Sequence, residues 1–329
     1  MNPLAVQFAG IALESPLVLA SGVLGTTASS LRRVAEAGAG AVTTKSCSLD
    51  PRKGHVAPCI LPWRGGMLNA VGLSNPGMEG AMAEIAEYKR GCAVPLFVSI
   101  FAGSPEEFGK LAKRMAEAKP DLIEVNVSCP NVESEFGIPF AADPVACGAV
   151  TRAVKENAGG VPVSIKLSVQ CASIAKMAEV CQQNGADVIT AINTVGPGMW
   201  IDTGVGRPVL SNKVGGVSGT AILPIAVRAV YEIRKAVDLP IIGTGGVSCA
   251  DDVLQLVMAG ADAVGVGSGI YEGGVELFGE INRGLAEWLK ARGVGAIGKV
   301  RGMAQGTGES ISNIQCSIFN DQGNSRGRA

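Results

Sequence analysis

The residues with the clearest chemical potential lie in Asn126-Val127-Ser128-Cys129-Pro130-Asn131, which places a cysteine between two asparagines. A cysteine is more often an inert, small apolar side chain than a catalyst, and we interpret the other eight cysteines in that way. Cys129 differs because it follows a predicted strand and stands beside amides that can donate and accept hydrogen bonds. At such a position a cysteine can take a proton from a substrate as a general base.

Lysines and asparagines stand where other predicted strands end, namely Lys45, Asn126, Lys166 and Asn193. Buried lysine and asparagine side chains are costly unless they are paired. A single lysine at such a position would be interpreted as solvated or ion-paired. Because the carboxyl ends of barrel strands meet on one face, the set of four predicts one ligand-lined cavity.

Two glycine-rich turns predict a phosphate site. Gly243-Thr244-Gly245-Gly246 ends the seventh predicted strand, and Gly265-Val266-Gly267-Ser268-Gly269 ends the eighth. In β/α barrels these two loops often bind phosphate through backbone N–H groups and a helix N-terminus, and glycine permits the close approach. One such turn could simply be tight, but two in successive loops indicate a phosphate-bearing ligand.

The elements that must position these residues alternate along the chain. Apolar runs predict eight parallel strands that are buried on both faces, at Leu17–Ala20, Ala41–Thr44, Leu96–Ile100, Leu122–Asn126, Val163–Lys166, Val188–Ile192, Ile241–Gly243 and Ala263–Val266. Amphipathic stretches predict helices near 27–38, 79–90, 105–118, 143–156, 171–184, 222–236, 249–259 and 275–291. Ser104-Pro105 and Asp143-Pro144 are typical helix starts. Eight strand–helix units predict an α/β fold, a (β/α)8 TIM barrel; an open doubly wound sheet is the alternative.

Two insertions interrupt this alternation, at 46–78 after the second strand and at 193–221 after the sixth. Long loops in compact domains are usually functional, and both follow the carboxyl end of a strand. We therefore predict one catalytic barrel domain, 1–294, with insertions at the C-terminal face of the strands. A C-terminal tail, 295–329, follows it, and we expect the polar end of this tail to be disordered.

Composition narrows the class of protein. Apolar residues make up 47 % and charged residues 17 % of the 329 residues, and 28 basic residues nearly balance 29 acidic ones. This balance favours neither nucleic acid nor an anionic membrane as a partner, and no signal peptide or membrane span is apparent. With nine scattered cysteines, no Cys-x-x-Cys pair and a single histidine, we expect no bound metal. The cysteines fit reduced thiols in a cytoplasmic protein.

The motif at 126–131 resembles the signature of class 1 dihydroorotate dehydrogenases. Further similar segments are Ser21-Gly22, Thr44-Lys45, Gly66-Met67-Leu68-Asn69-Ala70-Val71-Gly72-Leu73, Asn75-Pro76-Gly77, Lys166-Leu167, Ile192-Asn193-Thr194, Gly215-Gly216-Val217-Ser218-Gly219 and Gly243-Thr244-Gly245-Gly246. They extend over roughly residues 4–290 in the order of the family. The segments at 75–77 and 215–219 make the chain most similar to the class 1B catalytic subunit. It departs from the family after the eighth strand, where Gly267-Ser268-Gly269 replaces the usual Gly-Thr-Ala.

The resemblance implies an FMN-dependent oxidation of (S)-dihydroorotate to orotate in pyrimidine biosynthesis. Hydride leaves C6 of the substrate for N5 of the flavin, and Cys129 removes the proton from C5. The substrate contacts that it implies come from Lys45, Asn69, Ala70, Val71, Gly72, Leu73, Asn126, Asn131, Asn193 and Thr194. The FMN contacts come from Ser21, Gly22, Thr44, Lys45, Asn126, Lys166, Ile192, Gly216, Gly245, Gly246, Gly267 and Ser268. Lys166 would lie near N1 and the C2 carbonyl of the flavin, where negative charge grows on reduction.

The resemblance also implies partners. Class 1B enzymes combine a homodimer of the FMN barrel with an electron-transfer subunit, giving a heterotetramer. That subunit carries FAD and a [2Fe–2S] cluster and passes electrons to NAD. A class 1A enzyme would use fumarate and act alone. The membrane-bound class 2 enzymes have an N-terminal membrane extension and a serine base, and we expect neither in this protein.

Two other functions compete with this one. Another FMN barrel enzyme, such as a dihydropyrimidine dehydrogenase, would share the flavin site and Cys129. Asn131 and Lys45 favour a carboxylated pyrimidine over that alternative. The alternative from a different class is a flavin-free, phosphate-binding barrel lyase or isomerase, which a yellow purified protein would exclude.

Overall fold

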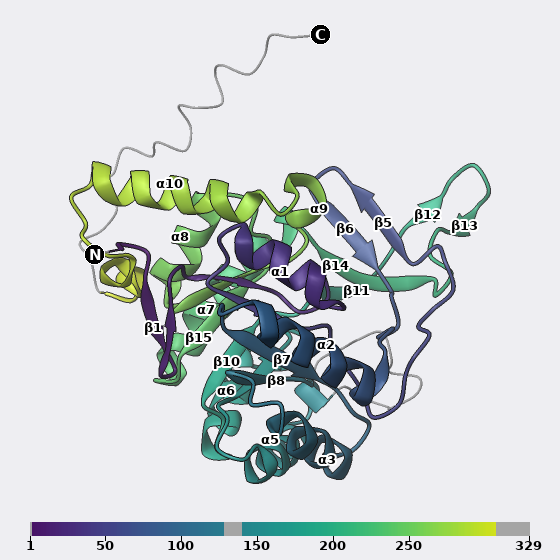
Figure 1. Cartoon of the computed structure of the whole chain (residues 1–329). Helices are drawn as coiled ribbons and strands as arrows, with labels where there is room; N and C mark the ends of the chain where they lie inside the picture. The colour runs from purple at the N-terminus through teal and green to yellow at the C-terminus, as the bar shows by residue number, and fades with distance from the viewer. Residues whose placement is uncertain (1, 128–139, 307–329) are drawn as a thin grey trace.

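Eight parallel strands close into a barrel at the centre of the protein (Figure 1). The computed structural model describes residues 2–127 and 140–306. The barrel strands are β3 (Leu17–Leu19), β4 (Ala41–Thr43), β7 (Leu96–Ile100), β8 (Leu122–Asn126), β9 (Val163–Leu167), β10 (Val188–Ala191), β15 (Ile241–Thr244) and β16 (Ala263–Val266). Pairing of β16 with β3 completes the closure. The predicted TIM barrel is therefore confirmed, and the open sheet is excluded.

Helices surround the barrel, and each of the predicted helices is present. They are α1 (Ala28–Glu36), α2 (Gly77–Gly91), α3 (Pro105–Ala116), α5 (Pro144–Asn157), α6 (Ile174–Gln183), α7 (Leu223–Ala236), α8 (Ala250–Ala259) and α10 (Leu277–Ala291), with a short α9 (Ile270–Gly273) before the last. Ser104 accepts a hydrogen bond from the backbone N–H of Glu107, and Asp143 caps α5 in the same manner. The two predicted helix starts are thus confirmed. No helix within the described residues is long and apolar enough to cross a membrane.

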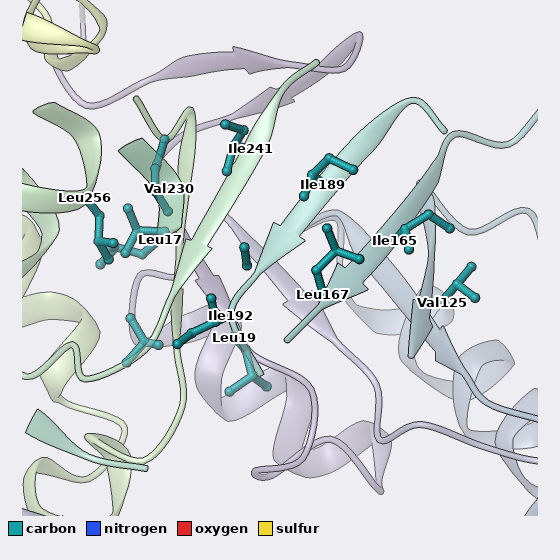
Figure 2. Packing of buried hydrophobic residues seen from close by; sticks show 14 of the residues in the cluster. Leu17, Leu19, Val125, Ile165, Leu167, Ile189, Ile192, Val230, Ile241 and Leu256 are labelled. Atoms are coloured by element: carbon teal, nitrogen blue, oxygen red, sulfur yellow. The ribbon is translucent and has the colours of Figure 1, made fainter. Parts of the chain in front are cut away.

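The main core lies between the strands and the surrounding helices. Figure 2 shows Leu17 of a barrel strand beside Val230 of α7 and Leu256 of α8, with Ile241 and then Ile189 on the neighbouring strands. All five side chains are fully buried. Because the barrel interior is also filled, both faces of each strand are covered, which explains why the strands read as continuous apolar runs.

The barrel interior consists of an apolar layer and a polar layer. The apolar layer includes Phe97, Leu122 and Ile242, and the hairpin of β1 (Val6–Phe8) and β2 (Ile11–Leu13) packs against it. Side chains alternate along a strand, so the next inward residues are two positions further on. These inward residues form the polar layer, which comprises Ser99, Glu124, Lys166, Thr190 and Thr244, each no more than 9% exposed. The sequence did not predict the hairpin, whose strands are only three residues long.

The two insertions meet in a second sheet beside the mouth of the barrel. Its antiparallel strands are β11 (Val195–Met199), β14 (Val214–Ser218), β6 (Gly66–Asn69) and β5 (Ile60–Trp63), in that order. A ribbon of β12 (Ile201–Asp202) and β13 (Arg207–Pro208) extends from it (Figure 1). Asn69 of the first insertion pairs directly with Gly216 of the second. The insertions were located from the sequence, but their strands were not.

The described part of the C-terminal segment packs on the barrel. Two 3-10 turns, Ile297–Val300 and Met303–Gln305, follow α10. Ile297 and Val300 are buried in the main core. The Gln305 side-chain amide donates hydrogen bonds to the carbonyls of Tyr231 and Ala259. The end of the tail, which we expected to be disordered, lies outside the described residues.

Candidate active site

A cavity of about 530 Å³ opens at the C-terminal ends of the barrel strands, below the second sheet. Its volume is within the range of about 300–1,000 Å³ that is typical of cofactor and small-molecule sites. Most of the predicted site residues line it, and these are Ser21, Gly22, Lys45, Asn69, Val71, Gly72, Leu73, Asn126, Lys166, Ile192, Asn193, Thr194, Gly245, Gly246, Gly267 and Ser268. The strand ends and both insertions therefore converge on one cavity, although the ligand that each residue contacts stays a prediction.

Three predicted site residues are described but do not line the cavity. Thr44 is buried, and its Oγ1 accepts a hydrogen bond from the backbone N–H of Ser99 at 3.0 Å. Ala70 is buried in a small apolar cluster. Gly216 lies behind Thr194, whose Oγ1 would be only 2.2 Å from a Cβ atom at that position. Cys129 and Asn131 lie outside the described residues, so their roles stay predictions.

Several cavity-lining residues were not individually assigned to a ligand from the sequence, and they are Ala20, Val23, Leu24, Ser46, Ile60, Met67, Ser218, Ile222, Thr244, Ile270 and Tyr271. Ser46 follows a strand end, so the rule that found Lys45 could also have found it, and Thr244 belongs to the glycine-rich turn that was predicted to bind phosphate. The apolar residues carry no such signal, because many apolar residues flank every strand. Here they supply walls suited to a flat ring system.

The predicted phosphate turns form a close backbone cradle. Gly245 and Gly246 have φ angles of +136° and +79°, which side chains other than glycine rarely adopt. A Cβ atom at Gly246 would lie 2.7 Å from the backbone N of Leu223, at the start of α7. Beside them, the buried Thr244 Oγ1 has no hydrogen-bond partner among the described residues. A glycine backbone that allows close approach beside a helix start fits a phosphate group, and the Thr244 hydroxyl is a polar atom that the described residues leave unsatisfied.

Gly246→Ala is expected to weaken FMN binding by at least about tenfold, because it adds a steric clash to about 1–2 kcal/mol of left-handed strain. The measurement is the dissociation constant of FMN, obtained by titrating apoprotein and following flavin fluorescence. Gly206→Ala is the matched control, because Gly206 also has a positive φ, +65°, but no heavy atom lies within 4 Å of its hypothetical Cβ. Equal FMN affinity in both variants would contradict the assignment of this turn.

Two of the predicted asparagines, Asn126 and Asn193, form a connected set at the cavity. The Asn126 Nδ2 atom donates to Ser46 Oγ, and Asn193 Nδ2 donates to Asn126 Oδ1, each at 3.3 Å. Asn193 Oδ1 in turn accepts from the backbone N–H of Thr194 at 2.8 Å. These bonds give each amide a defined orientation, so the set can distinguish donors from acceptors on a ligand.

The charged groups of the cavity lining are lysines. Among the described residues that line the cavity, the charged side chains are Lys45 and Lys166. Lys166 forms a buried ion pair with Glu124, in which Nζ lies 3.7 Å from Oε1 and the side chains are 7% and 4% exposed. Glu124 itself is not part of the lining. Each lysine gives the cavity an ammonium group that can donate hydrogen bonds to an anionic group of a ligand.

Four of the described cysteines have raised thiol pKa values, which fits the inert role that we predicted for them. Burial raises the pKa of the Cys47 thiol to about 12. Burial also raises the pKa values of Cys171 and Cys249, whereas the pKa of Cys181 is raised first by its contact with Cys147. Since the thiolate is the reactive form, these shifts disfavour proton abstraction by those four side chains.

Comparisons with known proteins agree with this geometry. A family model described as dihydroorotate dehydrogenase matches residues 3–289. The chain is 45% identical over 296 residues to a protein of Methanosarcina acetivorans named dihydroorotate dehydrogenase B (NAD(+)), catalytic subunit, covering 90% of this chain and 94% of that protein. Proteins of the same name from Methanothermobacter thermautotrophicus and Pyrococcus horikoshii are 43% and 42% identical over 301 residues, covering 92% of this chain and 98% and 97% of theirs. Each match thus spans nearly the whole of both proteins.

Proposed function

The chain belongs to the dihydroorotate dehydrogenase family, and we propose that it is a class 1B catalytic subunit that oxidises (S)-dihydroorotate to orotate in pyrimidine biosynthesis. The observation that carries this proposal is a single cavity that combines a glycine phosphate cradle, oriented asparagines and two lysines. Dihydroorotate offers a matching set of groups, because it has a carboxylate and a ring edge with alternating donors and acceptors.

FMN is the cofactor that we propose for this cavity. Its phosphate fits the turn at Gly245 and Gly246, where the absence of a side chain allows close approach to the backbone at the start of α7. The ribityl chain and ring system would continue along the cavity toward Lys166 and Asn126. When bound, FMN supplies the hydride acceptor for the reaction.

Residues of this chain take up the substrate proton, bind the substrate and neutralise negative charge. Cys129 takes the proton from C5 of the substrate as general base. Asn69, Asn126, Asn131 and Asn193 bind the ring edge and hold the substrate in one orientation. Lys45 neutralises negative charge on the substrate, and Lys166 holds positive charge where reduction makes the flavin ring more negative.

We also propose an electron-transfer partner. The relatives are named as catalytic subunits of an NAD-linked enzyme, which supports a second subunit for this chain. In our proposal that subunit carries FAD and a [2Fe–2S] cluster, and two copies of each chain form a heterotetramer. Free thiols on the described cysteines support a cytoplasmic location.

Anaerobic addition of dihydroorotate to the purified, FMN-loaded chain is expected to bleach the visible flavin band. Dihydrouracil serves as the control substrate, because it lacks the carboxylate that Lys45 would neutralise, and it should leave the band largely unchanged. After bleaching, NAD should restore the colour only when the partner subunit is present.

Three other results would each redirect the assignment. Bleaching by dihydrouracil rather than dihydroorotate would favour a dihydropyrimidine dehydrogenase. A protein that takes up no FMN would favour a flavin-free phosphate-binding barrel. Recovery of the colour by fumarate alone would place the chain in class 1A instead of class 1B.

A further inference from the structure

Glu124 is a buried carboxylate for which the proposed reaction has no role so far. It lies on β8, two residues before Asn126, and is 3% exposed. It belongs to the polar layer of the barrel, beneath the cavity, and does not line the cavity itself. A buried charge is retained only where other groups compensate it, so its contacts indicate what it does.

The first contact of Glu124 is Lys166, on the neighbouring strand β9. The Nζ–Oε1 distance of 3.7 Å makes an ion pair, although it is longer than a direct hydrogen bond. Within residues 2–127 and 140–306, Glu124 is the acidic group that pairs with Lys166. The Glu124 carboxylate, which does not line the cavity, therefore holds the Lys166 ammonium group at the cavity lining.

The second contact of Glu124 begins a chain of hydroxyl groups. Ser99 Oγ donates to Glu124 Oε1 at 3.1 Å, and Ser46 Oγ lies 2.8 Å from Ser99 Oγ. Ser46 Oγ is in turn 3.1 Å from Ser21 Oγ and 3.3 Å from Asn126 Nδ2. Ser99 is fully buried, whereas Ser21, Ser46 and Asn126 line the cavity. The chain thus leads from a carboxylate beneath the cavity to its lining.

The carboxylate gives this chain a fixed direction. An ionised carboxylate only accepts hydrogen bonds, and a hydroxyl group has one proton to donate. Because Ser99 gives its proton to Glu124, Ser46 must donate to Ser99. Ser46 can then only accept from Asn126, which requires the Nδ2 side of that amide to face it. Asn126 Oδ1 consequently faces Asn193, from which it accepts a hydrogen bond.

We propose that Glu124 is a positioning residue, which fixes the amide orientation of Asn126 and Asn193 through Ser99 and Ser46 and holds Lys166 beside the flavin. This inference rests on the proposed function for the identity of the ligands. Glu124 touches neither ligand, and its effect on substrate recognition passes through side chains that do. A preoriented amide set avoids the loss of affinity that reorientation on binding would bring.

Three variants separate the two effects of Glu124. Ser99→Ala cuts the hydroxyl chain and leaves the pair of Glu124 with Lys166 intact. Glu124→Gln removes the charge and so affects both the chain and the lysine. Ser164→Ala is the matched control, because Ser164 is also fully buried on a barrel strand and its Oγ forms a 2.8 Å hydrogen bond with Thr190 Oγ1, outside the chain. Thermal unfolding identifies any variant that fails to fold.

The readouts are the dissociation constant of orotate, from the flavin absorbance change of each FMN-loaded protein, and that of FMN, from titration of apoprotein. Ser99→Ala should weaken the binding of orotate about tenfold, which is about 1.4 kcal/mol. Its dissociation constant for FMN should stay within about twofold of that of wild type. Glu124→Gln should weaken the binding of both ligands about tenfold, and Ser164→Ala should change the affinity for neither. A merely structural role would not separate the two ligands in this way.

Two results would overturn the inference. The first is an orotate affinity within about twofold of wild type in both Ser99→Ala and Glu124→Gln. The second is an equal loss of orotate affinity in Ser164→Ala and Ser99→Ala, which would show that removing any buried hydroxyl group has this effect. If Glu124→Gln does not fold, Ser99→Ala decides the proposal. Wild-type protein that binds FMN but no orotate would contradict the proposed substrate, and the effect of Glu124→Gln on FMN affinity would still test the positioning of Lys166.

Discussion

Cys129→Ala is expected to slow the reduction of bound FMN by dihydroorotate about 10²–10⁴-fold, the usual contribution of a general base. The variant should retain FMN, because the phosphate cradle and Lys166 are unchanged. The measurement is the rate of flavin bleaching after anaerobic mixing, with the flavin content determined separately. A small loss of rate would point to a different base, and loss of FMN would point to a structural role.

Cys92→Ala is the matched control for this experiment. Cys92 follows α2 and is half-buried at the opposite end of the barrel from the cavity. The same thiol-to-methyl change there should leave the bleaching rate near that of wild type. Equal slowing in both variants would exclude a specific role for Cys129.

Lys166→Ala is expected to reduce both stability and FMN binding, and to slow flavin reduction. It leaves the Glu124 carboxylate buried without its ammonium partner, and breaking a buried pair in this way costs about 3–5 kcal/mol. It also removes the positive charge that we place beside the flavin. The measurements are the free energy of unfolding by denaturant, the flavin content and the bleaching rate.

Two further variants separate stability from function at Lys166. Lys155→Ala removes a lysine whose pair with Asp187 is more than one third exposed, so it should cost at most about 1 kcal/mol. The double variant Lys166→Ala/Glu124→Gln removes both buried charges and should recover stability but not FMN affinity. Wild-type flavin content and bleaching rate in Lys166→Ala would remove this residue from the site.

The barrel could be predicted because its sequence signals are local. Each barrel strand is short and mainly apolar, and the N-caps of α3 and α5 are encoded within four residues. The second sheet has no such signal. Its strand Val214–Ser218 contains two glycines, and Ile60–Trp63 contains a proline, both of which are unfavourable in strands. Their pairing is specified by contacts between insertions that are about 150 residues apart, such as Asn69 with Gly216, and no local pattern encodes these.

In the candidate site, too, the features with a local sequence signal were predicted and those that depend on distant contacts were missed. The rule that polar residues at strand ends face one cavity located Lys45, Asn126, Lys166 and Asn193 together. The polar layer beneath them was missed, although Glu124 is a charged residue inside the apolar run Leu122–Asn126 and could have been noticed. Its relation to Ser99 and Lys166 depends on the register of three strands, which the sequence does not give. The family resemblance extended to Ala70, which is buried away from the cavity.

The pairing of Asn69 with Gly216 has a consequence for how the two ligands act on each other. Asn69 belongs to the proposed substrate set and lines the cavity, whereas Gly216 belongs to the proposed FMN set and lies just behind the lining, and both are fixed in one backbone ladder. A shift of this ladder that strengthens the binding of one ligand therefore also moves backbone that lies close to the other ligand. Thermodynamic linkage makes such an effect reciprocal. If bound FMN changes the affinity for orotate by some factor through this pair, bound orotate must change the affinity for FMN by the same factor.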